Sequence, residues 1–413
     1  MTLEIRLFSL MRAAFRPDEP TRIGVAVSGG GDSLALLHLL ARLAPEEGWQ
    51  IQAATVDHAL RPESAAEARQ VAEICAHLGI RHKVLRWDHG PVSGNLQDAA
   101  RRARYRLLGD WAAGEDISHV ALAHTADDQA ETFLMGLSRV AGLDGLVGMR
   151  PCWAHGQVRF VRPLLGARRA ELRDYLKDRR IGWIDDPSND DPRYARVRAR
   201  RALAELASLG ISAGTLEGVM SNLRQVQQML QQLAEDLARR IASEIGGMVL
   251  IDRAAWQEQP LELRRRLMIA ALLSVSGAEY PPRAAAIRRL LAVVAAGRTA
   301  TLWGCHIQVT TSEIRVLREE RAVRRARVPP GRPWDCRWHV DGPFERGMEI
   351  RALGAEGLKY CPDWRETGLP RAALLVSPAV WGQDRLVSAP LAGFSHGFSA
   401  RIDAAFMLSS VLH

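Results

Sequence analysis

Three consecutive glycines, Gly29 to Gly31, follow a predicted strand and precede a predicted helix, and they constrain the fold more than any other feature of the chain. Residues 23–27 are apolar and largely β-branched, and leucines recur at helical spacing after Ser33. Glycine allows a tight turn without a Cβ clash, and the first N–H groups of a helix lack partners within it. The sequence therefore predicts a phosphate-binding turn between a buried strand and a helix.

The side chains of this turn, Ser28-Gly29-Gly30-Gly31-Asp32-Ser33, refine the prediction. Ser28 and Ser33 can donate hydroxyl groups to phosphate oxygens. Asp32 would repel phosphate unless a cation lies between them, so we interpret it as a Mg²⁺ contact. No Gly-Lys-Ser/Thr follows, which excludes the Walker-type P-loop. The alternative is an ordinary strand-to-helix turn with an acid favoured by the helix dipole.

Length and composition limit the class of protein. The chain has 413 residues, enough for two or three domains, and 47% of them are hydrophobic. Its net charge of +8 favours a polyanionic partner. The five scattered cysteines form no metal-ligand pattern and indicate a reduced, cytoplasmic protein. We find no signal peptide and no apolar run of roughly 18 residues, so no membrane partner is expected.

Strand and helix patterns alternate through the N-terminal half. Strands are expected at 23–27, 49–56, 80–87 and 119–123, with helices between them. This alternation predicts an α/β domain with a Rossmann-like parallel sheet, which we place at residues 1–210. Asp57 and His58 follow the second strand and are expected beside the phosphate turn, because ligands bind beyond the carboxyl ends of such strands. They can equally be turn residues.

A helix predicted at 95–111 carries Arg101, Arg104 and Tyr105 on one face. A solvated basic face is the usual explanation. The forked donors of two arginines beside an aromatic ring also suit a phosphate or an RNA backbone.

The strand at 119–123 ends in His124-Thr125-Ala126-Asp127-Asp128-Gln129-Ala130-Glu131. Thr125 and Asp128 form a capping-box pattern, which explains part of this segment structurally. Capping requires neither His124 nor Glu131. Asp127 and Glu131 are four residues apart on one helix face and repel each other unless a cation lies between them. We therefore favour a functional interpretation here.

The rest of the chain is divided by composition. The glycine-rich segment 139–149 is predicted to be a mobile loop, and 183–200 combines an acidic, proline-broken loop with an arginine-rich helix start. Residues 211–328 are expected to form a mostly helical domain with long helices at 215–245, 261–274 and 282–296 and a hairpin at 299–318. A linker at 321–333 precedes a small α+β module at 334–413, with strands at 348–352 and 373–377.

The phosphate turn resembles that of the N-type ATP pyrophosphatases, and the ordered set of motifs resembles the tRNA(Ile)-lysidine synthetase family over most of the chain. Thr125, Val140, Ala141 and Val197 stand where many family members carry other residues. The motifs that carry the resemblance, besides the turn, are Asp57-His58-x-Leu60-Arg61-x-x-Ser64, Ala100-Arg101-x-x-Arg104-Tyr105, Ala123-His124 with Asp127 to Thr132, Arg139 with Gly142-Leu143-x-Gly145-Leu146, Arg162-Pro163-Leu164-Leu165 and Asp186-Pro187-Ser188-Asn189.

This resemblance implies a two-step ligation. ATP activates the C2 oxygen of the wobble cytidine in a CAU-anticodon tRNA(Ile), pyrophosphate leaves, and the amine of free L-lysine then displaces AMP. It implies ATP and Mg²⁺ as cofactors, and a homodimer is conceivable. The residues assigned to the nucleotide are Ser28, Gly29, Gly30, Gly31, Asp32, Ser33, Asp57 and His58, with Asp32 as metal contact. Those assigned to catalysis are Asp32, Arg101, Arg104, His124, Asp127, Asp128 and Glu131, and those assigned to substrate are Arg61, Arg139, Asn189, Arg196 and Arg198.

Other functions remain open at this point. A tRNA thiolase also activates a base with ATP, but it needs a persulfide cysteine or a cysteine-bound cluster, and neither Cys75 nor Cys152 lies in such a motif. A small-molecule synthetase of the NAD or GMP type would not need a basic helical region and a further module. A non-catalytic tRNA-binding protein would not need Asp32, His124 and Asp128 together.

Overall fold

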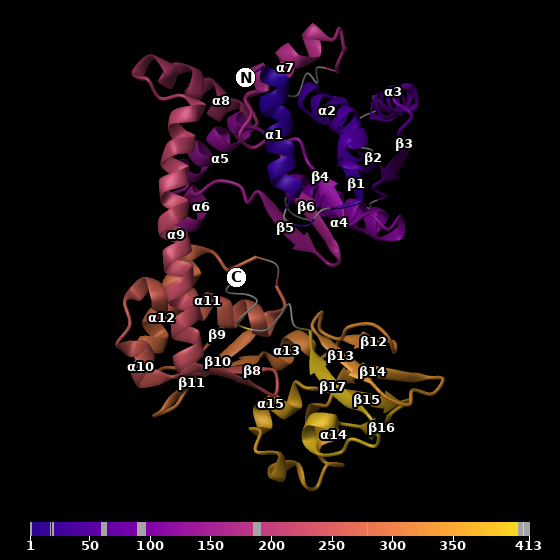
Figure 1. Ribbon diagram of the computed structural model, residues 1–413. Coiled ribbons are helices and arrows are strands. Elements are labelled where there is room, and N and C mark those ends of the chain that lie inside the picture. The colour runs from indigo at the N-terminus through magenta and orange to yellow at the C-terminus, as the bar shows by residue number, and fades with distance from the viewer. Residues whose placement is uncertain are drawn as a thin grey trace. The chain divides into compact units, whose positions relative to one another are not determined.

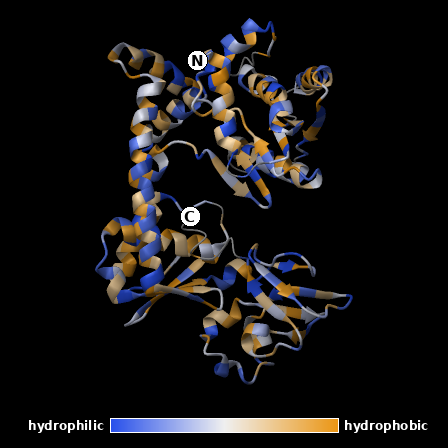
Figure 2. Cartoon of the chain, in the orientation of Figure 1, coloured by the Kyte–Doolittle hydropathy of each residue, from blue (hydrophilic) through white to orange (hydrophobic). Residues whose placement is uncertain are grey.

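The computed structural model describes residues 2–16, 18, 20–58, 64–88, 96–184, 191–278, 280–403 and 408 (Figure 1). The chain divides into two compact units, Met1–Gln227 and Gln228–His413. The division falls within the long helix α9 (Ala213–Ile241), along which hydrophobic and hydrophilic residues alternate (Figure 2). The composition-based boundaries near 210 and 330 stay a prediction.

The first unit is built on a six-stranded sheet in the order β3-β2-β1-β4-β6-β5. All neighbouring pairs are parallel except β5 with β6, so the predicted Rossmann-like parallel sheet is confirmed. The strands are β1 (Arg22–Ala26), β2 (Gln50–Asp57), β3 (Arg81–Arg86), β4 (His119–Ala121), β5 (Cys152–His155) and β6 (Val158–Val161). The antiparallel β5–β6 hairpin was not expected from the sequence.

Helices cover both faces of this sheet. Leu7, Leu36 and Leu172 share one buried cluster, which joins α1, α2 and α7 to the sheet, and Leu108 and Phe160 belong to the cluster on the other face, under α4. Successive residues of a strand point to opposite faces, so the apolar run of β1 supplies both clusters. The helices of this unit are α1 (Leu3–Phe15), α2 (Gly31–Glu47), α3 (Ser64–His77), α4 (Leu96–Gly114), α5 (Ala126–Ser138), α6 (Leu143–Leu146), α7 (Arg169–Asp178), α8 (Ala195–Leu206) and η2 (Ala207–Leu209).

The strand order places a topological switch between β1 and β4. After β1 the chain adds β2 and then β3 on one side, and it returns to add β4 on the other side. Ligands of open α/β sheets bind at such a point, beyond the carboxyl ends of the strands. The glycine turn follows β1, and His124 follows β4. The fold therefore brings together the two segments that the sequence singled out.

The second unit contains a five-stranded sheet in the order β7-β8-β11-β10-β9, packed against helices through Trp256, Leu267 and Ile307. Its elements are β7 (Ala242–Ile245), β8 (Met248–Asp252), α10 (Arg253–Gln257), α11 (Leu261–Ser276), α12 (Ala284–Ala295), β9 (Ala300–Leu302), β10 (Cys305–Val309), β11 (Glu313–Arg318) and α13 (Glu320–Val323). The hairpin predicted at 299–318 is thus three strands, and the helix predicted to reach 245 ends at Ile241.

The C-terminal segment of the second unit is an α+β arrangement, as expected, with Trp334 and Trp381 buried. Its sheets have the orders β12-β14-β15-β16 and β13-β17. Its elements are β12 (Arg327–Val328), β13 (Trp338–Asp341), β14 (Met348–Ala352), α14 (Gly354–Leu358), η3 (Trp364–Thr367), α15 (Arg371–Leu375), β15 (Pro378–Gly382), β16 (Arg385–Ser388), η4 (Pro390–Ala392) and β17 (Ser399–Ile402).

Two local predictions in this segment are wrong. The strand expected at 373–377 is mostly the helix α15, because Pro370 precedes it as N-cap and the true strand begins at Pro378. The linker expected at 321–333 contains the buried Val323 and the short strand β12, which pairs with β14. The arginines and prolines of this segment favoured the linker prediction over a helix or a strand.

Candidate active site

The glycine turn connects β1 to α2 with its N–H groups open. Gly29 has φ +86°, and a Cβ there would lie 2.7 Å from Cδ1 of Ile184, so both the conformation and the space require glycine. Gly30 is the N-cap of α2 and makes no side-chain cap hydrogen bond within the described chain. The first turn of α2 is therefore left with unsatisfied donors and the positive end of the helix dipole, which suit an anion.

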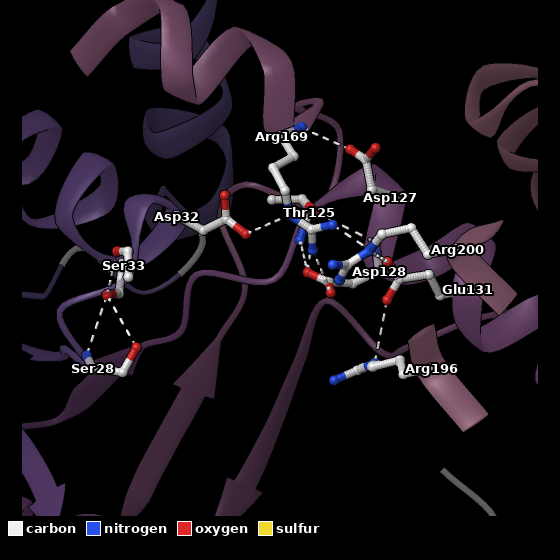
Figure 3. Close-up of polar contacts among 11 residues, drawn as sticks. Ser28, Asp32, Ser33, Thr125, Asp127, Asp128, Glu131, Arg169, Arg196 and Arg200 are labelled. Carbon is white, nitrogen blue, oxygen red and sulfur yellow. Dashed lines mark hydrogen bonds and ion pairs between the residues drawn. The ribbon is translucent and has the colours of Figure 1, made fainter. Parts of the chain in front are cut away.

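Two serines close the turn. Ser33 Oγ donates to the Gly30 carbonyl oxygen at 2.9 Å and accepts from the main-chain N–H of Ser28 at 3.2 Å. The two hydroxyl oxygens lie 3.3 Å apart (Figure 3). These hydrogen bonds hold the turn in one conformation before any ligand binds. Little conformational entropy is therefore lost when a ligand binds to it.

Two adjoining cavities open at the turn, and they share Ala26, Ser28, Gly30, Arg104 and Ile184. The smaller, of about 320 Å³, extends over the ends of β1 and β2 and is also lined by Val27, Ala54, Thr55, Val56, Asp57, His58, Ser64 and Glu67. The larger, of about 610 Å³, extends towards β4 and is also lined by Gly31, Asp32, Ser33, Ala123, His124, Asp128, Arg169, Arg173, Arg196 and Arg200. Its arginines outnumber its carboxylates, so it favours an anion.

Arg104 from α4 lies where the two cavities meet. Burial lowers the pKa of its guanidinium, and no hydrogen bond or ion pair joins it to any residue that the structure describes. A half-buried guanidinium without a counter-ion is unfavourable unless an anion completes the site. This is the strongest single indication that phosphate belongs here.

Arg169, at the start of α7, lies among three carboxylates (Figure 3). Its Nε donates to Asp32 Oδ2 at 2.9 Å, one terminal nitrogen lies 3.0 Å from Asp128 Oδ1, and the other lies 3.3 Å from Glu131 Oε1. Burial alone would lower the pKa of Arg169, but Asp128 and Asp32 outweigh burial and raise it. Its main-chain N–H donates to Asp127 Oδ2 at 2.7 Å.

Glu131 is completely buried and is surrounded by arginines. Besides Arg169, Arg200 Nε donates to its Oε1 at 2.8 Å and Arg196 Nε lies 3.4 Å from its Oε2. That second oxygen accepts no hydrogen bond from the described residues. This oxygen is therefore paired with Arg196 through charge alone and can still accept a hydrogen bond.

Asp128 has two functions, one on each oxygen. Thr125 is the N-cap of α5, and Asp128 Oδ2 accepts from the Thr125 main-chain N–H at 2.9 Å, which confirms the predicted capping box. Its Oδ1 faces Arg169 and the cavity. Burial favours the neutral acid, but Arg169 and Arg196 together hold the pKa of Asp128 below its usual value.

Asp32 faces the same cavity from the glycine turn. Burial raises its pKa, and the nearby guanidinium of Arg169 offsets part of this effect. His124 is half-buried at the cavity wall, and its Nδ1 accepts a hydrogen bond from Arg162 Nε at 3.0 Å. Burial, and then the charge of Arg162, lowers the pKa of His124 to about 3.

The other candidate residues are placed as follows. Asp57 and His58 line the smaller cavity, where Ser64 Oγ donates to Asp57 Oδ1 at 2.7 Å. Arg196 lines the larger cavity. Six of the candidates line neither cavity. Gly29 and Glu131 are described above, Asp127 accepts from Arg169, Arg101 is exposed over the Tyr105 ring, Arg139 is the exposed C-cap of α5, and Arg198 donates to main-chain carbonyls. Arg61 and Asn189 lie outside the described residues.

Sequence reasoning assigned no function to Arg169, Arg173 and Ile184, and it identified Arg200 only as part of the arginine-rich helix start at 183–200. Arg169 lies in a segment to which the sequence analysis assigned no function. Arg162 lay in a quoted motif but had no assigned function, and the structure places it against His124. No cysteine lines either cavity within the described part of the chain.

A parallel sheet with a glycine turn, open helix N–H groups and a cationic cavity at its switch point defines an ATP-binding protein of the PP-loop class. The PP-loop domain family matches residues 3–207, the region that contains every element of this site. A U34-tRNA thiolase from Methanococcus maripaludis, solved with its [4Fe-4S] cluster, shares 15% identity with a TM-score of 0.47, over 55% of this chain and 80% of that chain.

Relatives extend over both units. A tRNA(Ile)-lysidine synthase of Ruegeria pomeroyi is 48% identical over 398 residues, covering 96% of this chain and 95% of that protein. A second tRNA(Ile)-lysidine synthase, from Hyphomonas neptunium, is 42% identical over 303 residues, covering 71% of this chain and 80% of that protein. The chain belongs to the tRNA(Ile)-lysidine synthase family. No helix in the described part of the chain is long and apolar enough to cross a bilayer.

Proposed function

We propose that this protein uses ATP to join free L-lysine to C2 of the wobble cytidine of a CAU-anticodon tRNA(Ile), through an adenylated tRNA intermediate. The C2 oxygen attacks the α-phosphorus and pyrophosphate leaves; a lysine amine then attacks C2 and AMP leaves. The observation that carries the proposal is Arg104, a half-buried cation without a counter-ion at the junction of two cavities. Family membership supports the choice of substrates.

We place ATP with its adenosine in the smaller cavity and its phosphates towards the larger one. The smaller cavity has apolar walls from β1 and β2, with Asp57 and Ser64 at its edge, and it suits an adenosine. The glycine turn and Arg104 lie at its mouth, where the α-phosphate would follow. The larger cavity then takes pyrophosphate together with the base and the amine that react. Arg104 stabilises the charge that develops at the α-phosphorus, a contribution of the kind that preorganised donors supply.

Mg²⁺ fits Asp32 as an ion shared with phosphate. Mg²⁺ commonly binds one or two carboxylates together with substrate phosphates. No group of three or more His, Cys, Asp or Glu among the described residues is arranged to hold a metal by itself, which agrees with a shared ion. Asp32 is the residue that would hold it. When bound, the ion neutralises phosphate charge and favours the departure of pyrophosphate.

His124 acts as a neutral donor. A neutral imidazole whose Nδ1 accepts from Arg162 carries its proton on Nε2, so it can donate a hydrogen bond into the cavity. With a pKa of about 3 it is a poor proton acceptor at neutral pH. The ammonium group of lysine is assigned to the carboxylates Asp128 and Glu131, which attract it by their charge.

Partner binding beyond the catalytic cavities is also part of the proposal. Arg139 and Arg198 are exposed and suit the phosphates of an anticodon arm, and the regions 211–328 and 334–413 are assigned to the rest of the tRNA. A cytoplasmic location follows from this substrate. A homodimer stays a prediction, which the mass of the tRNA-free protein in solution tests.

Nucleoside analysis tests the proposed function directly. The protein is incubated with CAU-anticodon tRNA(Ile), ATP and isotopically labelled lysine, and the digested nucleosides are analysed by mass. We expect one cytidine to gain the mass of lysine less water. The reaction without lysine should release pyrophosphate without that product. A sulfur-containing nucleoside formed with a sulfur donor, and none with lysine, would support the thiolase instead.

A further inference from the structure

Arg169 connects the two halves of the proposed reaction centre. Asp32 belongs to the phosphate turn, whereas Asp128 and Glu131 belong to α5, to which we assign the lysine amine. One guanidinium bonds to all three, at 2.9, 3.0 and 3.3 Å (Figure 3). The guanidinium therefore pairs at the same time with Asp32, which we assign to Mg²⁺, and with Asp128 and Glu131, which we assign to the lysine ammonium group.

The three carboxylates depend on Arg169 to different extents. Glu131 also has Arg196 and Arg200, and Asp128 also has Thr125. Among the described residues, Arg169 is the only donor to the Asp32 carboxylate. A divalent cation that binds Asp32 thus removes the bond from Arg169 Nε and places a second positive charge beside the guanidinium.

The surroundings allow the guanidinium to move. Arg169 lines the cavity of about 610 Å³ and retains 17% side-chain exposure. Its backbone is held by the bond from its N–H to Asp127, so only the side chain needs to change position. Phosphate oxygens in the cavity offer it bidentate acceptors, which guanidinium groups favour.

We propose that Arg169 is a cation that gates lysine binding by responding to nucleotide. Without ATP it holds Asp32, Asp128 and Glu131 together and competes with the lysine ammonium. With Mg²⁺ and ATP bound, it turns from the carboxylates to the phosphates and leaves Asp128 and Glu131 available. Lysine is therefore excluded until the nucleotide is in place. This inference depends on the proposed function, because it uses the same carboxylates for the same substrate.

The buried oxygen of Glu131 supports this order of events. Its Oε2 accepts no hydrogen bond from the described residues, yet it has no exposed surface that an incoming ammonium could reach. Movement of Arg169 away from Oε1 opens a path to this carboxylate. The ammonium then replaces the charge that Arg169 withdraws, while Arg196 and Arg200 stay beside the buried carboxylate.

Equilibrium binding tests the inference without turnover. The affinity of the full-length protein for labelled lysine is measured by dialysis, with and without Mg²⁺ and α,β-methylene-ATP, which cannot release pyrophosphate. We expect lysine to bind about 5- to 150-fold more tightly with the analogue, the usual range of coupling between sites. By reciprocity, lysine should increase the affinity for the analogue by the same factor.

Variants identify the residue responsible. Arg169→Met should bind lysine with the same affinity whether or not the analogue is present, and Arg169→Lys should show reduced coupling, because one ammonium cannot span three carboxylates. Lys177→Met, an equal loss of charge on the exposed side of α7, should retain the full coupling. Circular dichroism checks folding, and if the Met variant does not fold, the Lys variant decides.

Two outcomes would overturn the gate. One is equal lysine affinity of the unaltered protein with and without the analogue, and the other is undiminished coupling in both Arg169 variants. Either result can occur in a protein that still attaches lysine to tRNA in the nucleoside analysis, in which case the gate fails alone. Absence of the lysine-containing nucleoside would instead reject the proposed function.

Discussion

Arg162 donates a hydrogen bond from its Nε to Nδ1 of His124 at a distance of 3.0 Å. The guanidinium also lies over the Trp153 ring, 4.1 Å from its centre, and donates to the carbonyl oxygen of Arg150. A guanidinium cannot accept a proton, so His124 Nδ1 must be the acceptor. This pair therefore determines the tautomer and the charge of the imidazole.

The first prediction concerns the charge of His124. We expect its ring to stay neutral from pH 8 down to pH 5, with the proton on Nε2, because burial and Arg162 lower its pKa to about 3. Nitrogen-15 NMR of labelled histidine measures both properties. Arg162→Met should raise this pKa towards 6.5, since one of the two main causes is then absent. A His124 signal that titrates near pH 6.5 in the unaltered protein would refute the assignment.

The same shift affects stability in acid. The pKa of His124 is lower in the folded chain than in the unfolded chain, so between about pH 3 and 6.5 the unfolded chain binds more protons. The contribution of this residue is fully present above pH 6.5 and decreases as the pH falls towards 3. Urea unfolding of His124→Gln should accordingly show a weaker pH dependence in this range than the unaltered protein.

The second prediction concerns Asp32. Asp32→Asn should decrease pyrophosphate release by about 10²-fold or more, because it removes the one carboxylate of the phosphate turn. Asp174→Asn provides the control, since Asp174 is exposed on α7. ATP–pyrophosphate exchange in the presence of tRNA gives the rate. Near-normal exchange in the Asp32 variant would mean that the cation binds elsewhere.

The sequence predicted best those features that depend only on residues close together in the chain. The glycine turn, the capping box of Thr125 and Asp128, and the strand–helix alternation were all predictable, because spacing along the chain determines them. The resemblance to tRNA(Ile)-lysidine synthetases is likewise confirmed by the relatives. What this reasoning could not provide is the arrangement of residues brought together only by folding.

Arg169 is the clearest example of that limit. It lies 137 residues from Asp32 and 38 from Glu131, and nothing in its local pattern distinguishes it from an exposed helix residue. The β5–β6 hairpin and α15 were missed for a related reason, since short elements are determined by their packing partners more than by propensity.

The third prediction concerns the stability of the arginine cluster around Glu131. Glu131→Gln leaves Arg169, Arg196 and Arg200 close together without their shared counter-ion. We expect the free energy of unfolding to fall by about 3–5 kcal/mol, as when one partner of a buried ion pair is removed. Urea titration followed by circular dichroism measures this change. Glu205→Gln on the exposed side of α8 should change it little, and equal values for the two variants would contradict the burial of Glu131.

The fourth prediction concerns tRNA binding. The net charge of +8 and the exposed arginines of α8 imply contacts with phosphates, so the affinity for tRNA should fall about 10³-fold between 50 and 200 mM salt if six or more phosphates are contacted. Arg198→Met should weaken binding and reduce the slope of log affinity against log salt by about 1. Arg69→Met, at an exposed position of α3, is the charge-matched control and should leave that slope unchanged. Filter binding over a salt series measures all three proteins, and a flat response in the unaltered one would mean that these arginines only solvate the surface.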